Sequence, residues 1–242
     1  MAILVAALTP KYLSRMLTPT GVIHAWLLGS LLLSSSVTNL ALGISYFLLG
    51  YAVTKLGYKR KLSLGIAEGQ STGRDGRRGP ENVWGSAGVP LLLTLPLYLN
   101  VPPPHIQLAI LGSFATKLSD TFASEIGKAY GKTTFLITTL RRVPPGTEGA
   151  VSLEGTLGGL LGAALMLLVG HSLSLVPTFK HGLAVLLASF LATNAESVIG
   201  ATIQEPWGMT NETVNFVMCA IGAALTISMG KGIAAGKKFF FF

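Results

Sequence analysis

The sequence has few charged residues and almost no cysteine. Only 12% of its 242 residues are charged, whereas a soluble domain has about 25%. This is too little charge for a globular surface in water, so the composition argues against a soluble domain and favours the lipid bilayer as solvent. The single cysteine, Cys219, excludes an internal disulfide and a cysteine-based metal cluster.

Targeting and metal-binding patterns are also missing. The apolar N-terminus, Met1–Leu8, lacks a basic segment, so we predict no cleavable signal or transit peptide. The histidines have no metal-ligand spacing and are interpreted as residues of the membrane interface; they are His24, His105, His171 and His181. The net charge is +8. In a membrane protein, such an excess of Lys and Arg indicates orientation and contact with lipid or phosphate, and we expect no nucleic-acid partner.

Apolar segments follow one another along the whole chain. A membrane-spanning helix needs about 20 mostly apolar residues. The sequence therefore predicts a single all-α membrane domain over residues 1–242, a polytopic transmembrane helix bundle of about seven spans. The count is six if the first two segments form one re-entrant or tilted element. The candidate spans are Gly21–Ser35, Val37–Val53, Val83–Leu99, His105–Ala123, Gly149–Val169, Lys180–Ile203 and Thr213–Gly230.

The connections between these segments differ in charge. Residues 54–82 form a long loop with seven Lys and Arg residues, and residues 128–148 hold four more, whereas 100–104 and 170–178 hold none. Loops rich in Lys and Arg mark the cytoplasmic side or its stromal equivalent. All ten acidic residues lie in or near 54–82, 128–148 and the turn at 204–210. This asymmetry is expected of an enzyme that reacts a lipid with a water-soluble phosphate donor at one membrane face.

The 54–82 loop contains a segment rich in glycine and arginine. Arg74, Arg77 and Arg78 lie among glycines, which let the backbone approach a ligand. Arginine offers phosphate a rigid fork of donors, and the segment leads into a predicted helix N-terminus, where the dipole favours anions. The composition supports two interpretations equally: a substrate phosphate site, or a basic loop held by anionic lipid headgroups.

Carboxylates within the candidate spans are costly in a bilayer and are functional hypotheses. Asp120 shares a helical face with Lys117, so an ion pair between them is the structural alternative. Asp120 and Glu125 would converge on one metal ion only if the helix breaks near Gly127. Glu196 is interpreted as a magnesium ligand, because Mg²⁺ takes a few carboxylates plus substrate phosphate oxygens. Its structural alternative is a polar contact between helices.

Three further segments need an interpretation. Residues 127–134 look like a P-loop, but three residues instead of four separate the glycines and a helix precedes them, which excludes that motif. Arg141, Arg142 and Thr147 flank a Pro-Pro-Gly turn and are interpreted as polar contacts at the membrane entrance. Glycines at 155, 158, 159 and 162 predict a helix-packing face, which is compatible with contacts within one bundle or with a homodimer.

Five segments resemble, in order and spacing, those of the phytyl-phosphate kinases of plants and cyanobacteria, within a wider family of transmembrane proteins of largely unassigned function. They are Gly76–Gly88, Ser119–Gly127, Pro145–Ser152, Glu196–Gln204 and Asn211–Phe216. The resemblance implies transfer of a phosphoryl group from a nucleoside triphosphate, CTP or another, to a prenyl monophosphate. The product would be a prenyl diphosphate for tocopherol and phylloquinone synthesis. It also implies a cyanobacterial or plastid membrane.

Residues and resemblance together predict a membrane prenyl-phosphate kinase. Its phosphate acceptor is already ionised, so a strong general base is unnecessary. We expect the prenyl tail between helices, against the glycine-rich faces. The expected catalytic residues and Mg²⁺ ligands are Asp120, Glu125 and Glu196. The expected phosphate-binding residues are Arg74, Arg77, Arg78, Asn82, Lys117, Arg141, Arg142, Thr147, Asn194 and Asn215.

Three alternatives remain open from the residues. A lipid-phosphate cytidylyltransferase would release pyrophosphate instead of a nucleoside diphosphate, and a prenol kinase would act on the free alcohol. A transporter would be expected to show internal repeats and a polar path to both faces. The sequence shows neither feature, which counts against the transporter.

Overall fold

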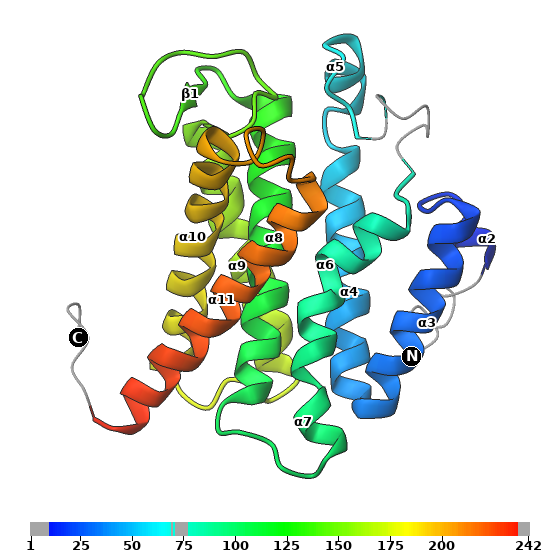
Figure 1. The fold of residues 1–242 in the computed structure, drawn as a ribbon, viewed down its shortest axis with the longest axis vertical. Coiled ribbons are helices and arrows are strands. Elements are labelled where there is room, and N and C mark those ends of the chain that lie inside the picture. Colours follow the sequence, from blue (N-terminus) through cyan, green and yellow to red (C-terminus); the bar gives the residue numbers. More distant parts are fainter. Residues whose placement is uncertain (1–9, 69, 71–76, 237–242) are drawn as a thin grey trace.

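The computed structural model describes residues 10–68, 70 and 77–236, and they form a helical bundle (Figure 1). The helices are α2 (Pro10–Leu13), α3 (Pro19–Ser35), α4 (Val37–Lys55), α5 (Tyr58–Ser63), α6 (Pro80–Leu93), α7 (Leu95–Tyr98), α8 (Ile106–Tyr130), α9 (Leu153–Ser172), α10 (Phe179–Thr202) and α11 (Asn211–Ala234). Strands β1 (Phe135–Leu136) and β2 (Ala150–Val151) form a short antiparallel hairpin. The predicted all-α class is confirmed.

Sequence signals at the helix ends explain where the helices begin. The hydroxyl groups of Thr18, Ser36, Ser152 and Thr210 accept hydrogen bonds from backbone N–H groups in the first turns of α3, α4, α9 and α11. These bonds satisfy donors that have no partner within the helix. Prolines at the starts of α3 and α6 have no such donor.

Each predicted span corresponds to a helix, with the third divided between α6 and α7. In the part of the chain that the structure describes, four helices are long and apolar enough to cross a membrane: α4, α9, α10 and α11. Helices α3 and α6, with 17 and 14 residues, are shorter than a full span. Helix α8 has 25 residues, but its C-terminal half carries several charges. The predicted number of about seven spans therefore stays a prediction.

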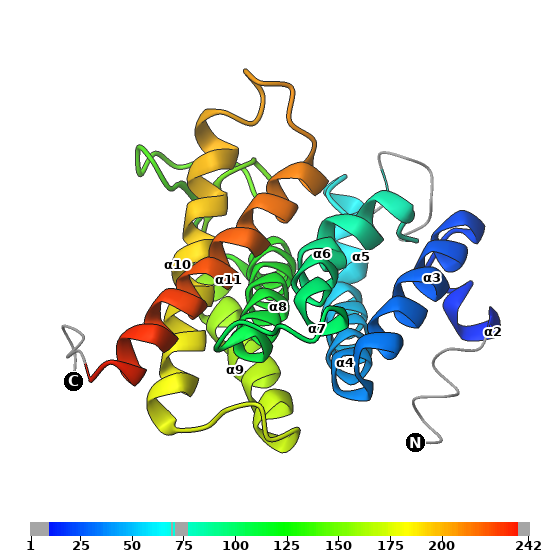
Figure 2. The ribbon, with the colours of Figure 1, turned by 60° about the horizontal axis from the view of Figure 1, so that its bottom comes forward.

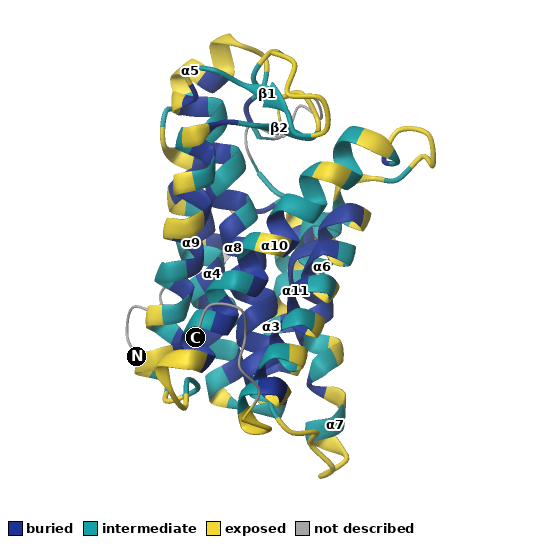
Figure 3. Ribbon diagram, turned by 90° about the vertical axis from the view of Figure 1, so that its left-hand side faces the viewer, coloured by how far each residue is buried: buried dark blue, intermediate teal, exposed yellow. Residues whose placement is uncertain are grey.

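Helix α8 lies at the centre of the bundle, with α4, α6, α9, α10 and α11 packed around it (Figure 2). Leu111, Phe114 and Leu118 are fully buried in its middle. A helix enclosed on all sides is mostly apolar around its circumference, and Thr116, a polar residue in this part of α8, has hydrogen-bond partners within the bundle. Burial is concentrated between the helices (Figure 3). Large apolar side chains on the outer surface, such as Leu168 at 64% exposed, would face lipid.

Small residues allow α8 to approach its neighbours closely. A Cβ added to Gly112 of α8 would collide with Thr226 of α11, and one added to Gly222 of α11 would collide with Thr116 of α8. Each threonine donates a hydrogen bond to the carbonyl of the glycine four residues earlier in its own helix, at 2.8 Å. Without a hydrophobic force between helices in lipid, such close contacts hold a membrane bundle together.

The glycine face of α9 packs on α8 in the same way. A Cβ at Gly155 would lie 2.8 Å from the carbonyl oxygen of Ala123, and one at Gly162 would lie 2.7 Å from that of Leu118. The predicted role of these glycines in helix packing is confirmed. Because α8 covers them within one chain, they provide no support for a homodimer.

The charged connections lie together at one end of the bundle. In Figure 1, α5, the β1–β2 hairpin and the α10–α11 connection lie at this end. The α3–α4 connection, α7 and the α9–α10 connection lie at the other. The grouping inferred from the charges of the connections is therefore present in the fold.

Candidate functional site

A polar cavity of about 190 Å³ opens at the charged end of the bundle, between α6, α8, α9, α10, α11 and the hairpin. Among the described residues, its carboxylates are Glu68, Asp120, Glu125, Glu148 and Glu196, and its cations are Arg78, Lys117 and Lys128. Carboxylates thus outnumber cations in the described part of the lining. The cavity lies along the C-terminal half of α8. The polar side chains of this half are enclosed by neighbouring helices.

Lys117, Asp120 and Asn215 form a buried cluster between α8 and α11. The Lys117 ammonium lies 2.6 Å from a carboxylate oxygen of Asp120 and donates to the side-chain oxygen of Asn215 at 3.0 Å. The Lys117 and Asp120 side chains are 8% and 13% exposed. The ion pair considered from the sequence is therefore formed. Because both partners also line the cavity, the pair does not exclude a role in binding.

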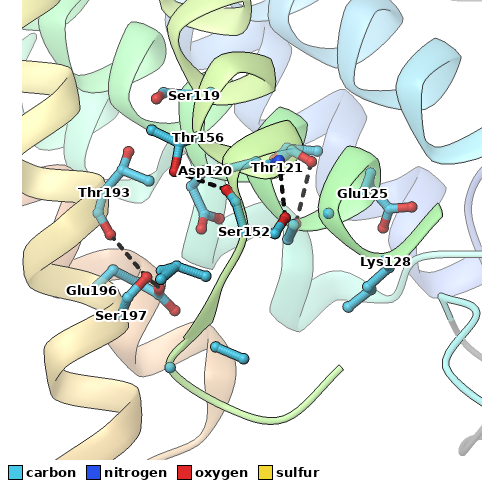
Figure 4. Close-up of a pocket in the computed structure, with 18 of the residues that line it drawn as sticks. Ser119, Asp120, Thr121, Glu125, Lys128, Ser152, Thr156, Thr193, Glu196 and Ser197 are labelled. Atoms are coloured by element: carbon cyan, nitrogen blue, oxygen red, sulfur yellow. Dashed lines mark hydrogen bonds between the residues drawn. The ribbon is translucent and has the colours of Figure 1, made fainter. Parts of the chain in front are cut away.

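Glu196 on α10 reaches the same cavity from the other side. Its carboxylate accepts a hydrogen bond from the Ser197 hydroxyl at 3.4 Å. No ion pair within the described part of the chain involves Glu196. In Figure 4 the Asp120 and Glu196 side chains lie in the same part of the pocket. Two carboxylates that share one pocket, one of them without a counterion among the described residues, suit a bound cation.

Glu125 lies away from these two carboxylates (Figure 4). Helix α8 runs unbroken to Tyr130, so it does not break near Gly127, as convergence of Asp120 and Glu125 on one ion requires. Among the residues that the structure describes, no three His, Cys, Asp or Glu side chains form a metal-binding group. Asp120 and Glu125 therefore do not converge on one ion, and the metal-binding roles of the three carboxylates, for one or two Mg²⁺ ions, stay predictions.

Glu125 instead forms an ion pair with Lys61 of α5. Lys61 is fully buried, and Glu125 is 3% exposed. The Lys61 ammonium also donates to the backbone carbonyl of Thr54 at 2.8 Å. The Thr54 hydroxyl in turn accepts a hydrogen bond from the Arg78 guanidinium at 3.0 Å. Glu125, Lys61 and Thr54 therefore form a chain of contacts that ends at Arg78 in the cavity wall.

The backbone of Arg78 is fixed as well. Its N–H donates to the carbonyl of Met16 and its carbonyl accepts from the N–H of Thr18, each at 3.0 Å. Burial tends to lower the pKa of Arg78, but the nearby Tyr46 and the carboxylates Glu68 and Glu125 outweigh it, so the pKa lies above its ordinary value. The guanidinium is therefore a permanent positive charge at the edge of the cavity.

The hairpin segment closes the cavity against α10. Gly149 has a φ of +72°, and a Cβ there would lie 2.5 Å from both the carbonyl oxygen of Ser197 and the Cβ of Ala201. A side chain would therefore meet both an unfavourable φ and a backbone clash. Gly146 has a φ of +87°, and a Cβ there would lie 2.8 Å from the Ile66 side chain. These glycines hold the segment over the polar cavity.

The structure brings most of the predicted site residues together. The cavity is lined by Arg78, Asn82, Lys117, Asp120, Glu125, Thr147, Asn194, Glu196 and Asn215. Arg141 and Arg142 are exposed on the hairpin segment, and neither they nor Arg77 line the cavity. Arg74 lies outside the described residues. For these four arginines, phosphate binding stays a prediction.

Sequence reasoning left some cavity residues out of the predicted site. Lys128 lies two turns after Asp120, on the same face of α8, with Ser124 between them. This repeated i, i+4 spacing was the signal that could have identified it. Ser152, which also lines the cavity, caps α9 after the hairpin. Its signal was a serine directly before an apolar helix.

Comparisons with known proteins agree with this architecture. The sequence matches the family described as integral membrane protein DUF92 over residues 2–223. An uncharacterized membrane protein of Synechocystis sp. is 47% identical over 228 residues, which cover 93% of this chain and 85% of that protein. Protein VTE6, chloroplastic, of Arabidopsis thaliana is 41% identical over 221 residues, or 88% of this chain. The match spans 65% of the length of VTE6.

A more distant relative comes from an archaeon. An uncharacterized membrane protein of Methanocaldococcus jannaschii is 31% identical over 215 residues, which cover 88% of this chain and 86% of that protein. No solved structure matches the chain.

Proposed function

The chain belongs to the DUF92 family of integral membrane proteins, and from this premise we propose that it is a prenyl-phosphate kinase. The acceptor would be a prenyl monophosphate, with phytyl phosphate as the first candidate. The phosphoryl donor would be a nucleoside triphosphate, either CTP or another one. The polar cavity at one end of a bundle with an apolar outer surface carries the proposal. Such a cavity suits a reaction between a membrane lipid and a water-soluble donor.

The proposed reaction needs little covalent help from the protein. An oxygen of the prenyl monophosphate attacks the γ-phosphorus of the nucleotide and forms a new P–O bond. The bond from that phosphorus to the β–γ bridging oxygen breaks, and the nucleoside diphosphate leaves with its electron pair. Catalysis then depends on alignment and on neutralising charge. Arg78 and Lys117 are cations in the cavity wall that would contact the phosphates.

The donor set of the cavity fits a magnesium ion held together with the substrates. Among the described residues, carboxylates outnumber cations in the lining, and Lys117 is already paired with Asp120. Two substrates with several phosphate charges therefore need a further cation. Mg²⁺ binds through one or two carboxylates plus substrate phosphate oxygens. Asp120 and Glu196 would supply the carboxylates. The ion would neutralise charge on the phosphates.

The setting of the proposed reaction follows from the relatives and the charge distribution. Relatives come from Synechocystis sp. and from the chloroplast of Arabidopsis thaliana, which supports a cyanobacterial or plastid membrane as the setting. For this membrane we propose a role in tocopherol and phylloquinone synthesis. The concentration of Lys and Arg at the cavity end supports a cytoplasmic or stromal orientation for that end.

A product assay on the purified protein in detergent tests the proposal. Separate reactions contain phytyl monophosphate or phytol, each with Mg²⁺ and either CTP or ATP, and mass spectrometry identifies the products. Phytyl diphosphate with a nucleoside diphosphate would support the kinase, and the faster nucleotide would identify the donor. A nucleotidyl lipid with pyrophosphate would make the protein a cytidylyltransferase. Phosphorylation of phytol, but not of phytyl monophosphate, would make the protein a prenol kinase. Absence of product with both lipids would contradict the proposal that the protein is such an enzyme.

A further inference from the structure

A second cavity lies beside the polar one and has a different lining. It is an apolar groove of about 100 Å³ between α3, α4 and α6. Leu28, Gly29 and Leu32 of α3 face Leu40 and Gly43 of α4 across it. Figures 1 and 2 show α3 at the edge of the bundle, beside α4 and α6. The groove thus lies at the edge of the bundle, next to the apolar outer surface.

The two cavities share one wall. Arg78, Asn82 and Ser86 line both of them. At this boundary the Tyr46 hydroxyl, 5% exposed as a residue, donates to the Ser86 hydroxyl at 3.0 Å. The polar cavity therefore passes into the apolar groove across a short band of polar groups that includes one permanent cation. A molecule with an anionic head and an apolar tail matches both cavities at once.

We infer that this groove binds the prenyl chain of the lipid phosphate, with its phosphate at Arg78. The inference rests on the proposed function, to which it adds the tail site. Trp26, which lines the groove, is 46% exposed. The groove therefore reaches the outer surface, and a tail can enter sideways from the bilayer.

Glycine creates the space in the groove. A Cβ at Gly43 would lie 3.0 Å from the Leu32 side chain, whereas a Cβ at Gly29 would lie 3.7 Å from that of Leu40, which is ordinary contact. Gly29 thus has room for a small side chain, and a large one there would occupy the groove. The prenyl tail was expected between helices, against glycine-rich faces, but the glycines of α9 offer no such room because α8 covers them.

The first test is a pair of leucine substitutions on neighbouring residues of α3. Gly29→Leu places a large side chain in the groove, whereas Ser30→Leu adds a leucine at an exposed position that does not line it. The assay compares phytyl monophosphate with dimethylallyl monophosphate, whose short chain leaves the groove largely empty. Misplacement of a reacting group by about 1 Å can cost roughly a hundredfold in rate.

We expect Gly29→Leu to lower kcat/KM for phytyl monophosphate by about tenfold to a hundredfold and to leave kcat/KM for the short substrate unchanged. Ser30→Leu is expected to match the wild type with both. If the wild type phosphorylates phytyl monophosphate and Gly29→Leu does so equally well, the groove is not the tail site. Equal losses with both substrates would also contradict it.

A binding measurement separates this inference from the proposed reaction. Phytyl monophosphate with a diazirine at the end of its tail is photolysed with the wild-type protein, and the labelled peptides are mapped. We expect labelling within α3, α4 or α6 that unlabelled phytyl monophosphate displaces and Gly29→Leu reduces. Labelling confined to α9, α10 or α11, or labelling that competitor leaves unchanged, would overturn the tail site. Correct labelling without turnover would uphold the tail site and reject the kinase.

Discussion

Substitution of Lys61 by Met is expected to destabilise the protein strongly, because it leaves the Glu125 carboxylate without its partner. Both side chains are almost completely buried, at 0% and 3% exposed. Removing one member of a buried ion pair typically costs about 3–5 kcal/mol, and Glu125→Gln is expected to cost a similar amount. Replacing both partners with apolar residues is often neutral, so Lys61→Met combined with Glu125→Leu should recover most of the lost stability.

The assay is unfolding in detergent with a denaturing surfactant, followed by circular dichroism, for both single variants and the double variant. Turnover and its dependence on Mg²⁺ are measured on the same preparations. We expect the double variant to be folded and active, because the Thr54 hydroxyl can still hold Arg78. A Glu125→Gln protein as stable as the wild type but without magnesium-dependent turnover would refute this reasoning and restore Glu125 as a metal ligand.

Three further substitutions test the bundle and the cavity. Asp120→Asn should abolish turnover and leave the protein folded, because the Lys117–Asp120 side chains are 8% and 13% exposed at the cavity, whereas the Lys61–Glu125 pair is almost completely buried; near-normal rates over a range of Mg²⁺ concentrations would contradict a metal role for Asp120. Arg78→Lys removes the donor fork and the bond to Thr54, so KM for the prenyl phosphate should rise about tenfold or more, and an unchanged KM would place the phosphate elsewhere. Gly222→Val would collide with Thr116 and should lower the unfolding free energy by about 1–3 kcal/mol, measured by the same unfolding assay; unchanged stability would contradict the close α8–α11 contact.

The sequence was sufficient to locate the helices but not all of their ends. The fourth span was predicted to end at Ala123, whereas α8 continues to Tyr130. A span predicted from hydropathy ends where charged residues begin. In α8 the helix continues past that point, because Glu125 and its neighbours are enclosed by protein instead of lipid. The sequence predicts a loop where α5 forms. The contact between Lys61 of α5 and Glu125 joins residues 64 positions apart, which the sequence alone does not reveal.

The candidate site was predictable to a similar extent. Asp120 and Glu196 were identified because a carboxylate in an apolar span needs a special reason to be there, and they do share a cavity. The partner of Glu125 was not predictable, since several lysines of the 54–82 loop were equivalent in the sequence. The tail groove was also hidden, because its lining is as apolar as any lipid-facing surface.

The position of Arg78 connects these observations. Its backbone is bonded on both sides to the segment before α3, and its side chain is bonded to Thr54, whose carbonyl accepts from the buried Lys61. A long side chain loses conformational entropy when it becomes ordered on binding, and these contacts already restrict Arg78. The same residue lines both the polar cavity and the apolar groove. A lipid phosphate bound there would have its head placed toward the carboxylates and its tail toward the bilayer by a single preorganised cation.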